Sequence, residues 1–172
     1  MAQPAEAKDG RRQTDEVVKK RKILLAGEDW IYLQAIAPQV EGHIPQTGTI
    51  MFAVSREHAE KLLRTIPFDF VITTNALYPT KKHARAHFLG NDGFTEGVKL
   101  IENLRSNKDW KTPADTSIIV LNTAHLFRLE ERHPNFSNLP GVRIIDIAVA
   151  EQKEFLEAFR QDLTNSSTPP TT

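Results

Sequence analysis

The chain has 172 residues, and its 22 basic and 22 acidic side chains cancel, so a strongly basic nucleic-acid-binding protein is not indicated. It contains no cysteine, which excludes disulfide scaffolds, cysteine-rich zinc modules and thiolate nucleophiles. No apolar run approaches the ~18 residues of a membrane-spanning helix, and the polar amino terminus lacks the apolar core of a signal peptide. We therefore expect a cytoplasmic protein that binds neither a membrane nor nucleic acid.

The two ends of the chain differ in composition from its centre. Residues 1–20 contain few apolar side chains and run into the basic sequence KKRK, and residues 164–172 are rich in Ser, Thr and Pro. Such segments cannot bury enough apolar surface to offset the entropy lost on ordering. The sequence therefore predicts a disordered basic arm at 1–20, one globular domain at 21–163 and a disordered tail at 164–172.

Five short apolar runs alternate with helical patterns inside that domain. The runs predict strands at residues 22–26, 49–54, 68–73, 117–121 and 143–149. Between and after them, helical patterns are expected at 30–42, 56–66, 95–105, 126–131 and 151–163. Asp29 and Ser55 are suited to cap the first two helices, while Pro38 is expected to kink or end the first and Gly42 to stop it.

The alternation of strands and helices predicts a doubly wound α/β fold. Parallel strands need crossover connections, and right-handed crossovers place helices on both faces of the sheet. Five strands in the order 2-1-3-4-5, as in flavodoxin-like domains, fit the length of the central region. In this fold a ligand site lies at the carboxyl ends of the strands, beside the switch between the first and third strands.

Several segments together resemble the receiver domain of bacterial response regulators. They are KILLAGED at 22–29, FDFVITTNALYP at 68–79, DGFTEGVKLIENLR at 92–105, IIVLNTAH at 118–125 and GVRIIDIAV at 141–149. The resemblance spans about residues 22–163. It implies a signalling protein whose acidic pair after the first strand holds Mg²⁺ and whose third strand ends in a phosphoryl-accepting Asp. It also implies a Thr or Ser after the fourth strand and a Lys after the fifth.

This sequence departs from that pattern at its centre. The acceptor position falls on Thr74, whose hydroxyl is a poor nucleophile without an activating base. The Lys position reads Ala148, and the switch position is Asn122 or, with a slip of one residue, Thr123. Loss of the acceptor and the Lys on separate strands implies a degenerate member of the family, a pseudo-receiver that has kept the fold without phosphoryl transfer.

Glu28 and Asp29 follow the first strand, but Gly27 occupies the first acidic position. The two acids could be the remains of a Mg²⁺ site, since carboxylates are the ligands that this ion prefers. The other interpretation, which we favour, is that Asp29 caps the following helix and Glu28 is solvated. No cofactor is therefore expected.

Two functions of different classes stay open. The first is a non-catalytic signalling or adaptor module that binds another signalling protein or a second copy of the chain. The second is a small ligand-binding protein or enzyme that uses the crevice around Glu28, Asp29, Thr74 and Asn122. Absence of the nucleophile and the Lys favours the first.

Two surfaces are candidates for partner binding. The insertion at 75–93 is basic and longer than a typical loop. Loops of more than ~12–15 residues in a compact domain are often functional. The resemblance also implies the face formed by 126–131, the fifth strand and the last helix. The candidate residues on the two surfaces are Lys81, Lys82, Arg85, Arg128, Arg143 and Lys153.

Overall fold

The computed structural model describes residues 20–43, 48–86, 95–122 and 138–146, together with Glu157 and Gln161. Its centre is a five-stranded parallel sheet in the order β2-β1-β3-β4-β5. The strands are β1 (Lys22–Ala26), β2 (Thr49–Ala53), β3 (Phe70–Thr74), β4 (Ser117–Asn122) and β5 (Val142–Asp146). Both the predicted fold class and the predicted strand order are confirmed.

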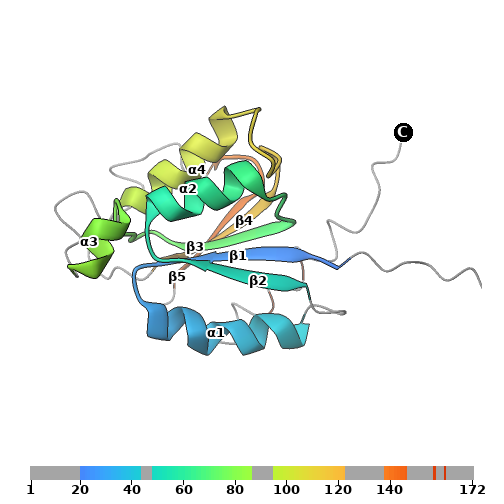
Figure 1. Cartoon of the computed structure of the whole chain (residues 1–172). Coiled ribbons are helices and arrows are strands. Elements are labelled where there is room, and N and C mark those ends of the chain that lie inside the picture. Colours follow the sequence, from blue (N-terminus) through green and yellow to red (C-terminus); the bar gives the residue numbers. More distant parts are fainter. Residues whose placement is uncertain are drawn as a thin grey trace, which may run out of the picture.

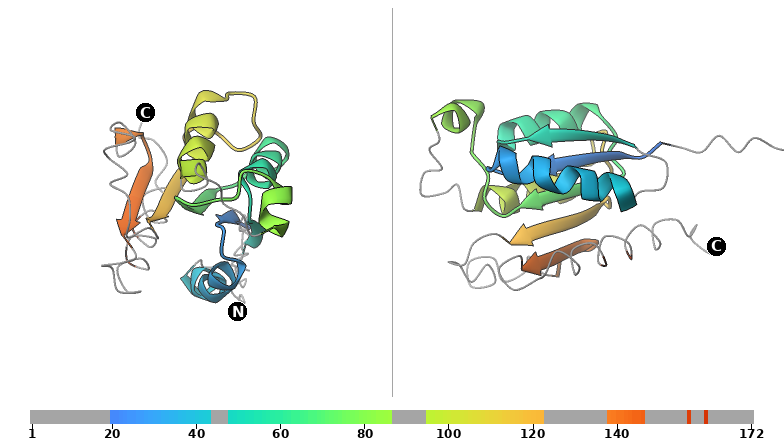
Figure 2. Two further views of the ribbon diagram at one scale, coloured as in Figure 1. Left: turned by 90° about the vertical axis from the view of Figure 1, so that its left-hand side faces the viewer. Right: turned by 90° about the horizontal axis from the view of Figure 1, so that it is seen from below.

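Helices cover both faces of this sheet (Figure 1). The helix α1 (Trp30–His43) lies on one face, and α2 (Arg56–Thr65) and α4 (Glu96–Ser106) lie side by side on the other. The short helix α3 (Lys81–Arg85) lies in neither layer but beyond one end of the strands, as the right-hand view of Figure 2 also shows. Within the described residues no helix is both long and apolar enough to cross a membrane.

The sheet has two apolar cores because successive side chains of a strand point to opposite faces. In β1, Ile23 and Leu25 pack in the core on the α1 face, with Leu33 and Val40 of that helix. Leu24 lies in the core on the α2 and α4 face. All of these side chains are buried. A continuous apolar run is what a strand covered on both faces requires, and this explains why the sequence KILLA predicted β1 to the residue.

Helix α1 begins as predicted but does not end as predicted. The Oδ1 atom of Asp29 accepts hydrogen bonds from the backbone N–H groups of Ile31 and Tyr32 at 2.9 and 3.1 Å, which is a helix cap. The expected end at Pro38 and stop at Gly42 are wrong, because the helix runs through both to His43, while the alternative of a kink at Pro38 stays a prediction. Pro38 is exposed, whereas Ile36, Ala37 and Val40 of the same helix are buried in the core, so the proline lies outside the packed face.

Strand β3 begins two residues later than predicted. The segment just before it is fixed by side-chain contacts instead of the sheet. Two hydrogen bonds, both of 2.8 Å, join Asp69 to the backbone of Lys22. The N–H of Asp69 donates to the Lys22 carbonyl, and the N–H of Lys22 donates to Oδ2 of Asp69. The Thr112 hydroxyl accepts from the N–H of Phe68 at 3.2 Å and donates to the Ile66 carbonyl at 2.7 Å. These bonds satisfy the backbone where the ladder has not yet begun.

Other element ends agree within one residue. Ser55 caps α2 as predicted, accepting a hydrogen bond from the N–H of His58 at 3.3 Å. The predicted polar stretch after β3 instead contains a buried segment at 75–78 and helix α3. Three predicted segments lie outside the described residues: the helices at 126–131 and 151–163, and the end of the last strand at 147–149. The exceptions are Glu157 and Gln161, which are helical. The predicted disordered ends at 1–19 and 164–172 also lie outside them.

The contact of α4 with β3 gives a testable prediction. A Cβ atom on Gly97 would lie 2.1 Å from the carbonyl oxygen of Thr74, whereas a Cβ on Gly42 in α1 would meet nothing within 4 Å. We expect Gly97→Ala to lower the free energy of unfolding by about 1–3 kcal/mol or more, because backbone must move. Gly42→Ala, the matched control, should raise it by about 0.5–1 kcal/mol.

Urea unfolding followed by circular dichroism measures both changes. A Gly97→Ala variant as stable as the wild type would contradict the close approach of α4 to β3.

Candidate functional site at the carboxyl edge of the sheet

Thr74, predicted at the acceptor position, is the last residue of β3 and is almost completely buried. Its Oγ1 lies 2.9 Å from Oε2 of Glu28 and 2.5 Å from the carbonyl oxygen of Ala76. A hydroxyl has one proton, so it can satisfy one of these acceptors at a time. The structure thus brings Thr74 and Glu28 together, as the sequence suggested, but it turns the hydroxyl towards the protein.

Gly27, at the first acidic position, leaves little room for a side chain. A Cβ atom there would lie 3.0 Å from Oγ1 of Thr74 and 3.1 Å from Cδ2 of Leu33. Contacts this short require a neighbour to shift by a few tenths of an ångström, and both neighbours here are buried. An acid at this position would therefore crowd Thr74 and the first helix.

The chain that follows β3 covers the same edge of the sheet. Tyr78 forms an isolated parallel bridge with Ser55, and its carbonyl accepts a hydrogen bond from the N–H of Arg56 at 2.8 Å. Because β1 lies between β2 and β3, the segment from Asn75 to Tyr78 must pass the carboxyl end of β1 to reach Ser55. All four residues of that segment are buried, and Leu77 belongs to the apolar core. The part of the switch-point crevice around Thr74 is covered here by the protein's own chain.

Glu28 and Asp29 each use one carboxylate oxygen within the protein. Asp29 uses Oδ1 to cap α1, and Glu28 uses Oε2 to accept from Thr74. The described residues contain no group of three or more His, Asp or Glu side chains arranged to hold a metal. The cap at Asp29 is the one that the sequence predicted. Burial raises the pKa of Glu28, despite hydrogen bonds from its own backbone and from Thr74 that lower it.

Other predicted site residues lie apart from this pair or outside the described part. Asn122 ends β4 and is half-buried. Its strand joins the edge through a hydrogen bond of 3.4 Å from the N–H of Asn75 to the carbonyl of Leu121. Thr123 and Ala148 lie outside the described residues. The switch and Lys positions therefore stay predictions.

The basic insertion forms a helix that the sequence did not predict. Thr80 caps α3, accepting a hydrogen bond from the N–H of His83 at 3.4 Å, and no side chain of the helix is buried. Lys81, Lys82 and Arg85 are all exposed. On the second candidate surface, Nη1 of Arg143 lies 3.3 Å from Oε1 of Gln161, while Arg128 and Lys153 lie outside the described residues.

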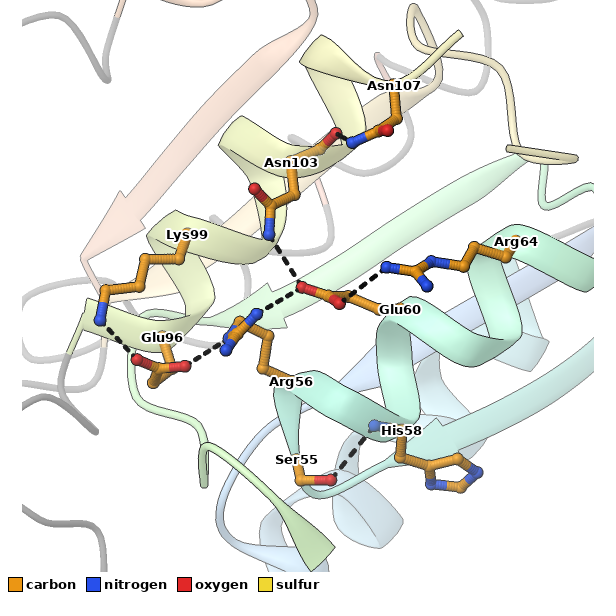
Figure 3. Close-up of polar contacts among 9 residues, drawn as sticks. All are labelled: Ser55, Arg56, His58, Glu60, Arg64, Glu96, Lys99, Asn103 and Asn107. Atoms are coloured by element: carbon orange, nitrogen blue, oxygen red, sulfur yellow. Dashed lines mark hydrogen bonds and ion pairs between the residues drawn. The ribbon is translucent and has the colours of Figure 1, made fainter. Parts of the chain in front are cut away.

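A polar network between α2 and α4 escaped the sequence analysis (Figure 3). Nε of Arg56 donates to Oε2 of Glu96, and its Nη1 donates to Oε1 of Glu60 at 2.6 Å. Asn103 Nδ2 donates to the same Glu60 oxygen at 2.8 Å, and Lys99 Nζ donates to Oε1 of Glu96 at 2.6 Å. The pairs at i and i+3 or i+4 were visible in the sequence, but the contacts from α2 to α4 depend on how the helices pack.

Glu96 is the most deeply buried acid of this network, with 3% of its side chain exposed. Burial acts to raise its pKa, but hydrogen bonds from Lys99 and Arg56 outweigh it and hold the pKa below the ordinary value of 4.5. A buried carboxylate with two cationic partners keeps its charge. The network ties the start of α4 to α2 and so helps hold α4 against the end of β3.

Comparisons with known proteins place this fold. No family model matches the sequence, and no curated protein matches it. Solved structures do match. The signal receiver domain of an HD-domain-containing protein from Pseudomonas fluorescens is 20% identical, with a TM-score of 0.60, over 86% of this chain and 98% of that one. The non-phosphorylated HemR receiver domain from Leptospira biflexa is 23% identical, with a TM-score of 0.58, over 89% and 100%.

A third match is the receiver domain of a sensor histidine kinase from Pseudomonas aeruginosa, solved with a magnesium ion in its active-site cleft. It is 11% identical, with a TM-score of 0.57, over 85% of this chain and 99% of that one. All three match over nearly their whole length. The chain has the receiver fold, and the sequence-based resemblance to receiver domains is confirmed at the level of fold.

Half-buried Glu28 and buried Glu96 predict opposite responses to pH. Glu28 has a raised pKa, so its contribution to stability is complete below the unfolded value of 4.5 and is lost as the pH rises through its folded pKa. Glu96 has a lowered pKa, so its contribution is present above 4.5 and is lost as the pH falls through its folded pKa. The prediction concerns the free energy of unfolding relative to the wild type, between the ordinary carboxyl pKa of about 4 and neutrality at about 7. As the pH rises through this range, that free energy should increase for Glu28→Gln and decrease for Glu96→Gln.

Urea midpoints of the wild type and both variants across this range test the prediction, each variant serving as the control for the other. Parallel pH profiles for all three proteins would contradict it.

Proposed function

We propose that this protein is a signalling or adaptor module with the receiver fold that does not transfer phosphoryl groups and acts by binding another protein. The observation that carries the proposal is the closed carboxyl edge of β1 and β3. Thr74 is buried there, and an acid in place of Gly27 would crowd it. Phosphoryl transfer to a receiver needs an accessible carboxylate at the end of the third strand, and this chain has the buried hydroxyl of Thr74 at that position.

The same observation weakens the enzyme alternative. A small ligand in the switch-point crevice would have to reach Thr74, which is covered by the segment 75–78. Glu28 accepts the hydrogen bond of the Thr74 hydroxyl, but that hydroxyl is buried and a substrate would have to displace the chain that covers it. A binding function is therefore better supported than catalysis at this crevice.

Helix α3 is the described surface best suited to meet a partner. It stands outside the two helical layers, with every side chain at least partly exposed. Three basic residues in one turn and a half, Lys81, Lys82 and Arg85, present a concentrated positive charge. Such rim charges accelerate encounter with an acidic surface, so we propose an acidic partner protein for this helix.

We expect that acetyl phosphate with Mg²⁺ will leave the protein unmodified, because no carboxylate ends β3. Intact-mass spectrometry measures this directly. The receiver from Leptospira biflexa named above, treated in parallel, shows whether the phosphodonor is active. Thr74→Asp should also stay unmodified, since Gly27 still supplies no second acid and the position remains covered. A stoichiometric acid-labile adduct on the wild type would refute the proposal.

We expect Lys81→Ala combined with Lys82→Ala to slow association with the partner by about threefold or more at low salt, with a smaller change in dissociation. The matched control is Lys108→Ala with Lys111→Ala, which removes the same charge from exposed residues after α4, at the other end of the strands. Surface plasmon resonance against the partner isolated with the wild-type chain measures both. Equal rates for the two double variants would remove α3 from the interaction.

A further inference from the structure

A groove lies beside the closed crevice, between the start of α1, the end of β2, and helices α2 and α3. Its volume is about 860 Å³, within the range of small-molecule sites of about 300–1,000 Å³. Its lining is mostly apolar and aromatic, with two acids and one histidine. The lining residues are Glu28, Asp29, Trp30, Ile31, Phe52, Val54, His58, Tyr78 and Ala84.

Three aromatic side chains stand in this groove. Trp30 packs edge-to-face against Phe52, with ring centroids 5.0 Å apart and an interplanar angle of 66°. Tyr78 is nearly buried, whereas Trp30 is 45% exposed and its neighbour Ile31 is 77% exposed. Among the residues the structure describes, these two are the large apolar side chains left in solvent. An exposed apolar cluster at a groove marks a binding surface.

The charge of the lining decides which ligand fits. Glu28 and Asp29 are acidic, and none of the described lining residues is a Lys or an Arg. Burial, followed by the charges of Lys81 and Lys61, lowers the pKa of His58 from 6.5, so it adds no positive charge at neutral pH. Those two lysines line a neighbouring depression, which shares His58 with the groove and also contains Glu57, Glu60 and Arg64. The described lining of the groove itself is therefore aromatic and acidic.

We propose that this groove binds a small organic ammonium ion that carries an aromatic or branched alkyl body. A cation over the face of an indole or phenol ring is attracted by the ring quadrupole, and Trp is the strongest of these partners. Asp29 uses Oδ1 for the helix cap, and Glu28 uses Oε2 for Thr74, so each carboxylate has a second oxygen that takes no part in these bonds. The inference stands apart from the proposed adaptor function, which concerns α3 and the closed crevice.

Fluorescence of Trp30 reports binding directly. The chain has two tryptophans. The other, Trp110, is not a lining residue of the groove, and its ring centroid lies 5.2 Å from the guanidinium carbon of Arg64. Trp110→Phe keeps an aromatic ring there and leaves Trp30 as the single reporter. The probes are benzyltrimethylammonium, choline, the neutral choline isostere 3,3-dimethylbutan-1-ol, and benzoate.

We expect saturable quenching by both cations, with choline binding at least about threefold more tightly than its neutral isostere and benzoate not binding. Asp29→Asn removes a charge but keeps a good helix cap, and Glu28→Gln keeps an acceptor for Thr74. Each should weaken benzyltrimethylammonium binding by about three- to tenfold and leave the isostere unchanged. Asp109→Asn, an exposed acid after α4, controls for net charge.

Several results would overturn the inference. They are absence of saturable binding by either cation, equal affinity for choline and its isostere, or an Asp109→Asn effect as large as that of Asp29→Asn. Trp30→Ala lacks the reporter, so its binding is measured by calorimetry. This variant must lose cation binding while circular dichroism shows an unchanged fold. Retained binding by this variant would also overturn the inference. A trimethyllysine peptide that binds tenfold more tightly than benzyltrimethylammonium would overturn the assignment to a small molecule.

Discussion

The hydroxyl of Thr74 between Glu28 and the carbonyl of Ala76 is the contact on which the carboxyl edge of this sheet depends. It turns a polar side chain inwards at a place where this fold usually opens to a ligand. With the hydroxyl buried, a side chain at Gly27 would crowd it, and the chain after β3 passes across the end of β1. The apolar Leu77 then joins the core in place of a crevice.

The same arrangement explains why α4 needs its polar anchor. Its second residue, Gly97, approaches the backbone of Thr74 so closely that only glycine fits, and its N–H donates to the carbonyl of Asn75 at 3.0 Å. The first residue, Glu96, is buried beside this contact and holds Arg56 of α2 and Lys99. Burying a carboxylate is costly unless it is paired, so the charges come as a network. Together these contacts fix the helix that closes the edge.

Closure of one site leaves two other features at the same end of the molecule. Helix α3 carries the basic side chains away from the sheet, and the groove beneath it is aromatic and acidic. Ala84 of α3 lines the groove, so the basic side chains of that helix border the acidic lining. Because salt screens charges only beyond about 8 Å at physiological ionic strength, the two surfaces influence one another's charge.

The sequence by itself determined the fold class, the strand order, the caps at Asp29 and Ser55, and the presence of Thr74 at the end of β3. These features follow from local patterns, since apolar runs predict buried strands and capping residues predict helix starts. The predicted helix end at Pro38 or Gly42 was wrong. Both residues lie on the exposed face of α1, where neither disturbs the packing against the sheet. Only the tertiary structure decided that Thr74 is buried, that Asn75 to Tyr78 cross β1, that Arg56 reaches Glu96, and that Trp30 and Tyr78 share a groove. These contacts join residues distant in the chain, and their geometry comes from packing, which no local pattern records.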